Sequence, residues 1–146
     1  MNLSEHFTLD EATESTTAIR RGIINQPTTL QIENMRFAAE GMELVRDLLG
    51  FPVKVNSWFR CPELNIAIGG AGKSAHMDGY AIDFTCPPFG DPLSICRAIQ
   101  ASDIRFDKLI FEGTWVYISF HPDLRGAIMT AHFRAGQPTT YTEGLA

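Results

Sequence analysis

Apolar residues recur at helical spacing over one long segment of the chain, from residue 30 to residue 50. Steps of three and four residues place them on one face of a helix, and Gly50 follows as a residue that commonly ends helices. The pattern predicts a long amphipathic helix over 30–50. Its apolar stripe consists of Ile32, Met35, Ala39, Met42, Val45 and Leu49.

Shorter helices are predicted from their start signals. Thr8 and Glu11 have the spacing of a capping box, and we expect one short helix from there through residue 22. Pro62 and Pro92 stand where the first turn of a helix tolerates proline, which predicts helices over 61–70 and 92–102. Loops are expected at 25–29 and at 69–74, the second one flexible.

Runs rich in β-branched and aromatic residues predict strands at 52–57, 80–86, 108–112, 115–120 and 127–133, with a tight hairpin at 112–114. The polar tail over 135–146 is expected to be irregular. Helices come first and strands then mix with helices, so the predicted class is α+β. We expect one domain over 1–146, with a small, mainly antiparallel sheet and flanking helices.

Composition and charge exclude some classes of function. A net charge of -5 over 146 residues argues against a nucleic-acid surface, which is normally basic. No apolar run approaches the ~18 residues that span a membrane, and no signal peptide is expected at the N-terminus. The cysteines have no paired spacing and predict reduced thiols rather than disulfides or a cysteine-rich zinc site. They are Cys61, Cys86 and Cys96.

A histidine and an aspartate near one strand supply candidate chemistry. His76 is expected in a loop just before the strand that carries Asp83, and Gly79 permits a sharp turn between them. Imidazole and carboxylate are ligands that suit zinc, although a catalytic zinc generally takes three protein ligands. From this pair alone, a polar loop histidine and a strand-edge carboxylate are the commoner interpretation.

The surrounding motifs resemble the M15 peptidases, a family of zinc D-Ala-D-Ala carboxypeptidases, dipeptidases and phage endolysins. The similarity extends to "FTLDEAT" near the start and "FDKLIFEGTWVYISFHP" near the end. It looks closest to the short phage-type branch, which has a bare catalytic domain. The matching residues are Ser57, Arg60 and Asn65 in one motif, and Ser74, His76, Gly79, Ala81 and Asp83 in the other.

This resemblance implies a hedgehog/DD-peptidase-like fold and a role for each motif residue. His76 and Asp83 would be zinc ligands. Arg60 would hold a substrate carbonyl or carboxylate and stabilise the oxyanion. Ser74 would hydrogen-bond the substrate or the neighbouring loop. Glu112 would be the general base toward a water activated by zinc.

The chain departs from the family at Tyr117, where M15 peptidases have the third zinc-ligand histidine. Three explanations stay open. The Tyr117 phenolate or a water completes a weak site; His121, on the same strand face by parity, substitutes after a bend in the chain; or the zinc is lost.

Trp58 and Phe59 beside Arg60 either wall a peptide groove or belong to the core.

Two functions follow from these alternatives. The first is a zinc-dependent, phage-type peptidase that hydrolyses a bond in the peptidoglycan stem peptide. The second is a catalytically impaired M15-like domain that acts as a virion structural or binding protein, with other virion proteins as partners. The missing signal peptide fits a protein that stays in the host cytoplasm until its release to the cell wall, or one carried in the virion.

Overall fold

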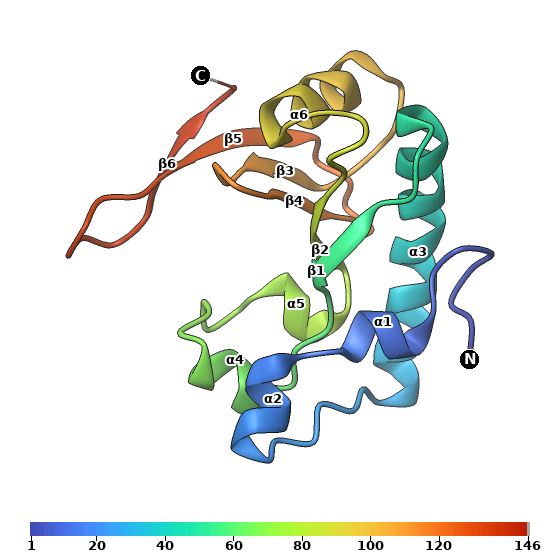
Figure 1. Cartoon of the computed structure of the whole chain (residues 1–146), viewed down its shortest axis with the longest axis vertical. Coiled ribbons are helices and arrows are strands. Elements are labelled where there is room, and N and C mark those ends of the chain that lie inside the picture. The colour runs from blue at the N-terminus through green and yellow to red at the C-terminus, as the bar shows by residue number, and fades with distance from the viewer. Residues whose placement is uncertain (146) are drawn as a thin grey trace.

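The computed structural model describes residues 1–145, which form a six-stranded sheet flanked by helices (Figure 1). The strand order is β1-β2-β4-β3-β5-β6, and only β3 and β5 run parallel. The predicted α+β class with a mainly antiparallel sheet is therefore confirmed. The strands are β1 (Lys54–Ser57), β2 (Ala81–Thr85), β3 (Lys108–Phe111), β4 (Val116–Ser119), β5 (Ala127–His132) and β6 (Thr140–Glu143).

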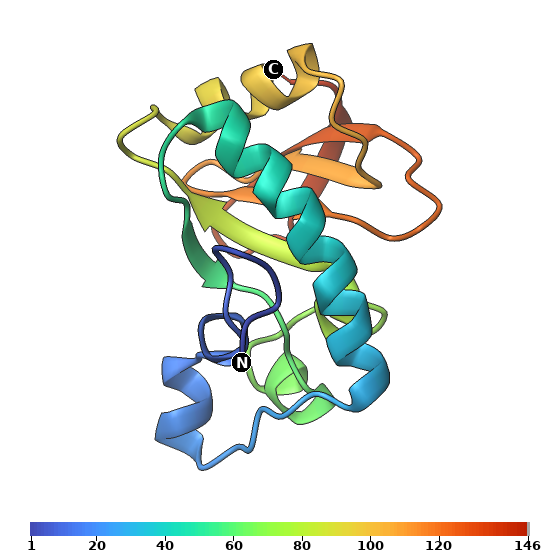
Figure 2. The ribbon, with the colours of Figure 1, turned by 90° about the vertical axis from the view of Figure 1, so that its right-hand side faces the viewer.

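The long predicted helix is α3, and it crosses one face of the sheet (Figure 2). The other helices are short, and none in residues 1–145 is long and apolar enough to cross a membrane. The helices are α1 (Leu9–Thr13), α2 (Thr16–Arg21), α3 (Thr29–Leu49), α4 (Pro62–Ala67), α5 (Ala75–Asp78) and α6 (Pro92–Ala101).

The core lies between the sheet and the pair α3 and α6. The apolar stripe of α3 is buried as predicted, except for Ile32, which is half-buried at its edge. Strand residues alternate between faces, so Ile82 and Phe84 enter the core while Asp83 between them points to the opposite face. Helices α3 and α6 thus leave the second face of the sheet uncovered, and Asp83 points to that face.

Three expectations about local structure were wrong. The single helix over 8–22 is two helices, because the Ser15 hydroxyl accepts from Ala18 N at 3.1 Å and caps a new one. The tail is not all irregular, since β6 pairs with β5. All four β6 residues are exposed, so backbone pairing forms this strand without the alternating burial that sequence patterns detect.

The third error concerns His76, which lies on the one-turn helix α5 and not in a loop. Ser74 caps this turn, with its hydroxyl accepting from His76 N at 3.2 Å. Gly79 ends it in a left-handed conformation, φ 88°. A Cβ at Gly79 would lie 2.6 Å from Met35 Cγ and 3.0 Å from the Gln31 carbonyl oxygen. Glycine therefore fixes how closely the His76 turn approaches α3.

Replacing Gly79 is expected to loosen this turn. We predict that Gly79→Ala lowers the free energy of unfolding by about 2–3 kcal/mol, from the left-handed backbone and the clash with α3 together. The matched control is Gly22→Ala, which has φ 66° and no atom within 4 Å of the new Cβ. It should cost about 1 kcal/mol, from the backbone alone. Equal losses in urea denaturation would contradict the close approach to α3.

Candidate active site

A row of side chains crosses the free face of the sheet. Strand register places Ser57 opposite Asp83, Asp83 opposite Tyr117, and Tyr117 opposite Ile110. The register shifts by one residue between Val55 and Ser57, a bulge that turns Ser57 toward the Asp83 face. Two residues from the predicted motifs and the departing tyrosine are thus neighbours on three adjoining strands.

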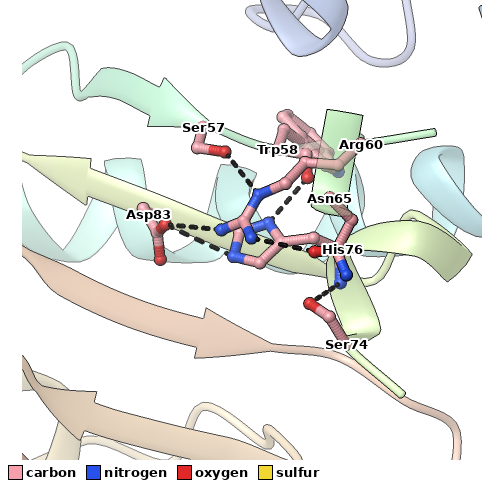
Figure 3. Close-up of polar contacts among 7 residues, drawn as sticks. All are labelled: Ser57, Trp58, Arg60, Asn65, Ser74, His76 and Asp83. Carbon is pink, nitrogen blue, oxygen red and sulfur yellow. Dashed lines mark hydrogen bonds and ion pairs between the residues drawn. The ribbon is translucent and has the colours of Figure 1, made fainter. Parts of the chain in front are cut away.

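His76 faces this row from α5, as Figure 3 shows. Its Nδ1 lies 2.7 Å from the Trp58 carbonyl oxygen, and its Nε2 lies 3.3 Å from Asp83 Oδ2. A carbonyl oxygen only accepts hydrogen bonds, so Nδ1 carries a hydrogen and donates it to Trp58. Nε2 points toward the carboxylate of Asp83. Nε2 without a proton and a carboxylate oxygen are both acceptors. A proton or a metal cation must therefore lie between them.

Trp58 makes hydrogen bonds to the α5 turn at two points, Gly79 and the ring of His76. Its indole Nε1 donates to the Gly79 carbonyl at 2.9 Å, while its own carbonyl holds the His76 ring. The side chain is buried, with Phe7 packed edge-on at a centroid distance of 5.9 Å. Phe59 is buried as well. Core packing is therefore correct for both aromatic residues, and neither lines the pocket beside His76 and Asp83.

Arg60 is tied into the same cluster by three weak hydrogen bonds (Figure 3). It donates to Ser57 Oγ at 3.3 Å, to Asn65 Oδ1 at 3.2 Å and to Asp83 Oδ2 at 3.5 Å. Asn65 is itself held by a bond to the Ala71 carbonyl at 2.8 Å. Burial lowers the Arg60 pKa, and the adjacent Asp83 opposes that effect. Arg60 therefore brings a positive charge to Asp83 and lines the pocket beside it.

Tyr117, where the resemblance predicts a histidine, lies next to both candidate ligands. Its ring meets the His76 ring edge-on, with centroids 5.6 Å apart. Burial raises the pKa of Tyr117 to about 12, so its side chain is a neutral phenol at physiological pH. The Ser119 side chain, close enough to hydrogen-bond the phenol, opposes this rise.

Glu112 also faces the pocket, because residues 108, 110 and 112 alternate onto one side of β3 and its extension. It is 8% exposed and is therefore not a solvated carboxylate at the hairpin tip. Burial, with Asp83 nearby, raises the Glu112 pKa to about 7. A carboxyl group of that pKa exchanges its proton readily near neutral pH, as a general base must.

His121 does not join the cluster. Its Nδ1 accepts from Asp123 N at 3.1 Å and its ring packs edge-on against Tyr80, at the rim of the pocket. Within residues 1–145, no three His, Cys, Asp or Glu side chains are grouped so as to hold a metal ion. The donors brought together are His76, Asp83 and the Tyr117 hydroxyl.

These groups line a pocket of about 610 Å³ that extends across the sheet from Arg60 toward β5 and β6. Asp83 Oδ1 is buried at its base without a hydrogen-bond partner. At the far end, Arg125 donates to Asp107 through Nε at 2.8 Å and Nη2 at 2.9 Å. Sequence reasoning missed Asp107, Lys108 and Arg125. The two-residue period of the strand from Lys108 to Glu112 is the one signal that could have placed Lys108 on the same face as Glu112.

Comparison with known proteins identifies the family. A sequence model of the family described as Peptidase M15 matches residues 5–118, so the chain belongs to the M15 peptidases. A comparison with curated proteins gives no match. The matched region includes every candidate site residue from Arg60 to Tyr117. It ends before His121, β5 and β6.

The raised pKa of Glu112 predicts a stability that depends on pH. The folded value, about 7, exceeds the ordinary 4.5, so folding favours the protonated carboxyl. Its contribution is present below pH 4.5 and is lost as pH rises through 7. We expect metal-free Glu112→Gln to match the parent near pH 4 and to exceed its unfolding free energy at pH 8 by about 2–3 kcal/mol.

Urea titrations of both proteins between pH 4 and pH 8, with a chelator present, measure this difference. The comparison at pH 4 serves as the internal control, because glutamine mimics the protonated carboxyl there. A stability difference that stays constant across this range would show that Glu112 titrates as a solvated residue does.

Proposed function

We propose that this M15 peptidase hydrolyses a peptide bond of the peptidoglycan stem peptide, with a zinc ion held at His76 and Asp83. The facing pair of His76 Nε2 and Asp83 Oδ2, 3.3 Å apart, is the observation that carries this proposal. We further propose a phage-type role, either as an endolysin released from the host cytoplasm to the wall or as a virion component.

Two of the three donors fit zinc well. The Trp58 carbonyl holds His76 in the tautomer that leaves Nε2 available, the arrangement by which proteins orient metal-binding imidazoles. Asp83 adds a carboxylate whose Oδ1 is buried and lacks a partner. Tyr117 is a poorer third donor than histidine, since its pKa of about 12 keeps the oxygen protonated until a cation displaces the proton. The site therefore favours weak zinc binding.

Zinc at this position would supply a water of lowered pKa and polarise the peptide carbonyl. The chain's own groups account for the remaining steps. Glu112, with its pKa of about 7, takes a proton from the attacking water and delivers it to the leaving amine. Arg60 lines the pocket as a fixed cation and stabilises negative charge that develops on the carbonyl oxygen. Ser74 orients the turn that carries His76.

The second candidate function is a domain that binds wall peptides or virion proteins without cutting them. Tyr117 is the observation that favours it. A buried neutral phenol packs against His76, where a third imidazole would complete the site. In that case the pocket recognises its ligand with the same polar groups but lacks the metal chemistry.

Metal content of the purified, untagged protein distinguishes the two functions. We expect Tyr117→His to raise zinc affinity at least tenfold and to increase hydrolysis of purified peptidoglycan, because imidazole binds zinc without first losing a proton at neutral pH. Asp83→Ala should abolish both zinc binding and hydrolysis. Near one zinc per chain, with release of new amino groups from the wall, would support the peptidase.

Two controls separate the ligand positions. Tyr117→Phe removes only the phenol oxygen and should lower zinc affinity if that oxygen is a ligand. His121→Ala should leave zinc affinity unchanged, because His121 Nδ1 is engaged by Asp123 at the pocket rim. Unaltered zinc affinity in Tyr117→His would show that residue 117 does not reach the metal and would refute this ligand set.

A further inference from the structure

Five large apolar side chains stay exposed along α3 and just beyond its C-cap, and together they are called the outer stripe below. Figure 2 shows this side of α3 facing the viewer, with no other element of residues 1–145 passing over it. Exposed apolar surface on this scale marks an interaction site more often than chance. The outer stripe consists of Leu30 (67% exposed), Phe37 (46%), Leu44 (53%), Leu48 (39%) and Phe51 (43%).

The outer stripe has the spacing of a helix-packing seam. Leu30, Phe37 and Leu44 follow one another at seven-residue steps, which is close to two helical turns, so they lie along one line of α3. The core-facing line of α3 is separate, since Met35 and Met42 are fully buried about 140° round the helix. Packing against the sheet therefore explains one apolar line of α3 and leaves the other without a partner in the fold.

A row of carboxylates runs beside the outer stripe. Glu33, Glu40 and Asp47 are exposed, and each comes three residues after a member of the stripe, about 60° round the helix. The arginine nearest this row does not neutralise it, because Arg36 donates to the Asn2 carbonyl oxygen at 3.1 Å. The outer face of α3 thus combines an apolar line with a negative flank that repeats at the same seven-residue spacing.

This charge pattern decides which occupant fits the face. In a two-fold antiparallel pair of copies, the same flanks adjoin, so the two acidic rows would meet and repel. A parallel pair would set each acidic row against the Asn34 side of the other helix, which carries no positive charge. The negative surface of an anionic membrane is repelled in the same way. Only a partner with a basic flank satisfies both the apolar line and the carboxylates.

We propose that the outer stripe of α3 docks an amphipathic helix of a partner protein, one with apolar residues at seven-residue spacing and lysine or arginine beside them. Burial of the two apolar lines drives the association, and the regular acidic row sets the register of the basic residues. The face lies on the side of α3 that is turned away from the sheet, whereas the pocket lies on the far face of that sheet. The inference therefore does not depend on the proposed peptidase function.

Two matched synthetic peptides test the surface. The basic probe has three heptads with leucine at the apolar positions and lysine beside them, and the acidic probe has glutamate in place of every lysine. Isothermal titration calorimetry gives Kd for each, and circular dichroism reports whether the peptide becomes helical when it binds. We expect the basic probe to bind about tenfold or more tightly than the acidic one, from three exposed ion pairs against three like-charge contacts. Added salt should reduce this ratio.

Leu44→Gln tests the apolar line. It should weaken binding of the basic probe about tenfold without lowering the melting temperature, because Leu44 is exposed and glutamine is nearly as good a helix former. Ile66→Gln is the matched control, which removes an apolar side chain that is 79% exposed on α4 and should leave Kd unchanged. Zinc content and wall hydrolysis should be the same in Leu44→Gln as in the parent, whatever the parent shows.

Glu40→Lys tests the acidic row. It should lower the preference for the basic probe several-fold, since one attractive contact becomes repulsive and the reverse holds for the acidic probe. Glu63→Lys makes the same charge change at an exposed position of α4 and should leave the preference unchanged.

Four results would overturn this docking surface. They are no binding of the basic probe, equal binding of both probes, binding that survives Leu44→Gln, and a parent protein that sediments as a dimer which Leu44→Gln dissociates. The last result would show that a second copy covers the face. Binding of the parent to phosphatidylglycerol vesicles that Leu44→Gln abolishes would likewise replace the helix by a lipid surface.

Discussion

The hydrogen bond from His76 Nδ1 to the Trp58 carbonyl oxygen, 2.7 Å long, fixes which imidazole nitrogen faces Asp83. Much of the site depends on this constraint. It leaves Nε2 against a carboxylate oxygen, and it ties the α5 turn to the chain that leaves β1. Trp58 contacts both ends of the turn, so the core that buries its indole also positions His76. The geometry of the site thus depends on the packing of the core around Trp58.

Charge around that pair is arranged in two halves. On the β1 side, Arg60 is bonded to Asp83 and compensates its buried charge. On the β3 side, Arg125 compensates the charge of Asp107, and Lys108 is left without an ion pair among residues 1–145. Buried charges are tolerated when they are paired, and both arginines that line the pocket are paired with a carboxylate.

The position of residue 117 is set by the backbone of β4. The backbone of β4 delivers residue 117 to the row between Asp83 and Ile110 whatever its side chain. A phenol fills the space of an imidazole and packs well against His76, so the fold accepts the change. A change of the ring at residue 117 therefore leaves the architecture intact.

Sequence pattern by itself determined the α+β class, the long α3 stripe and the five main strands, since local periodicity carries that information. The motif residues came from the resemblance to the family. It did not determine that 8–22 splits at Ser15, that β6 pairs with β5, or that Glu112 is buried while His121 stays at the rim. Nor did it show that Arg125 pairs with Asp107 and leaves Lys108 free. Those outcomes depend on which distant strands and turns come together, and contacts between residues remote in the chain leave no periodic trace in the sequence.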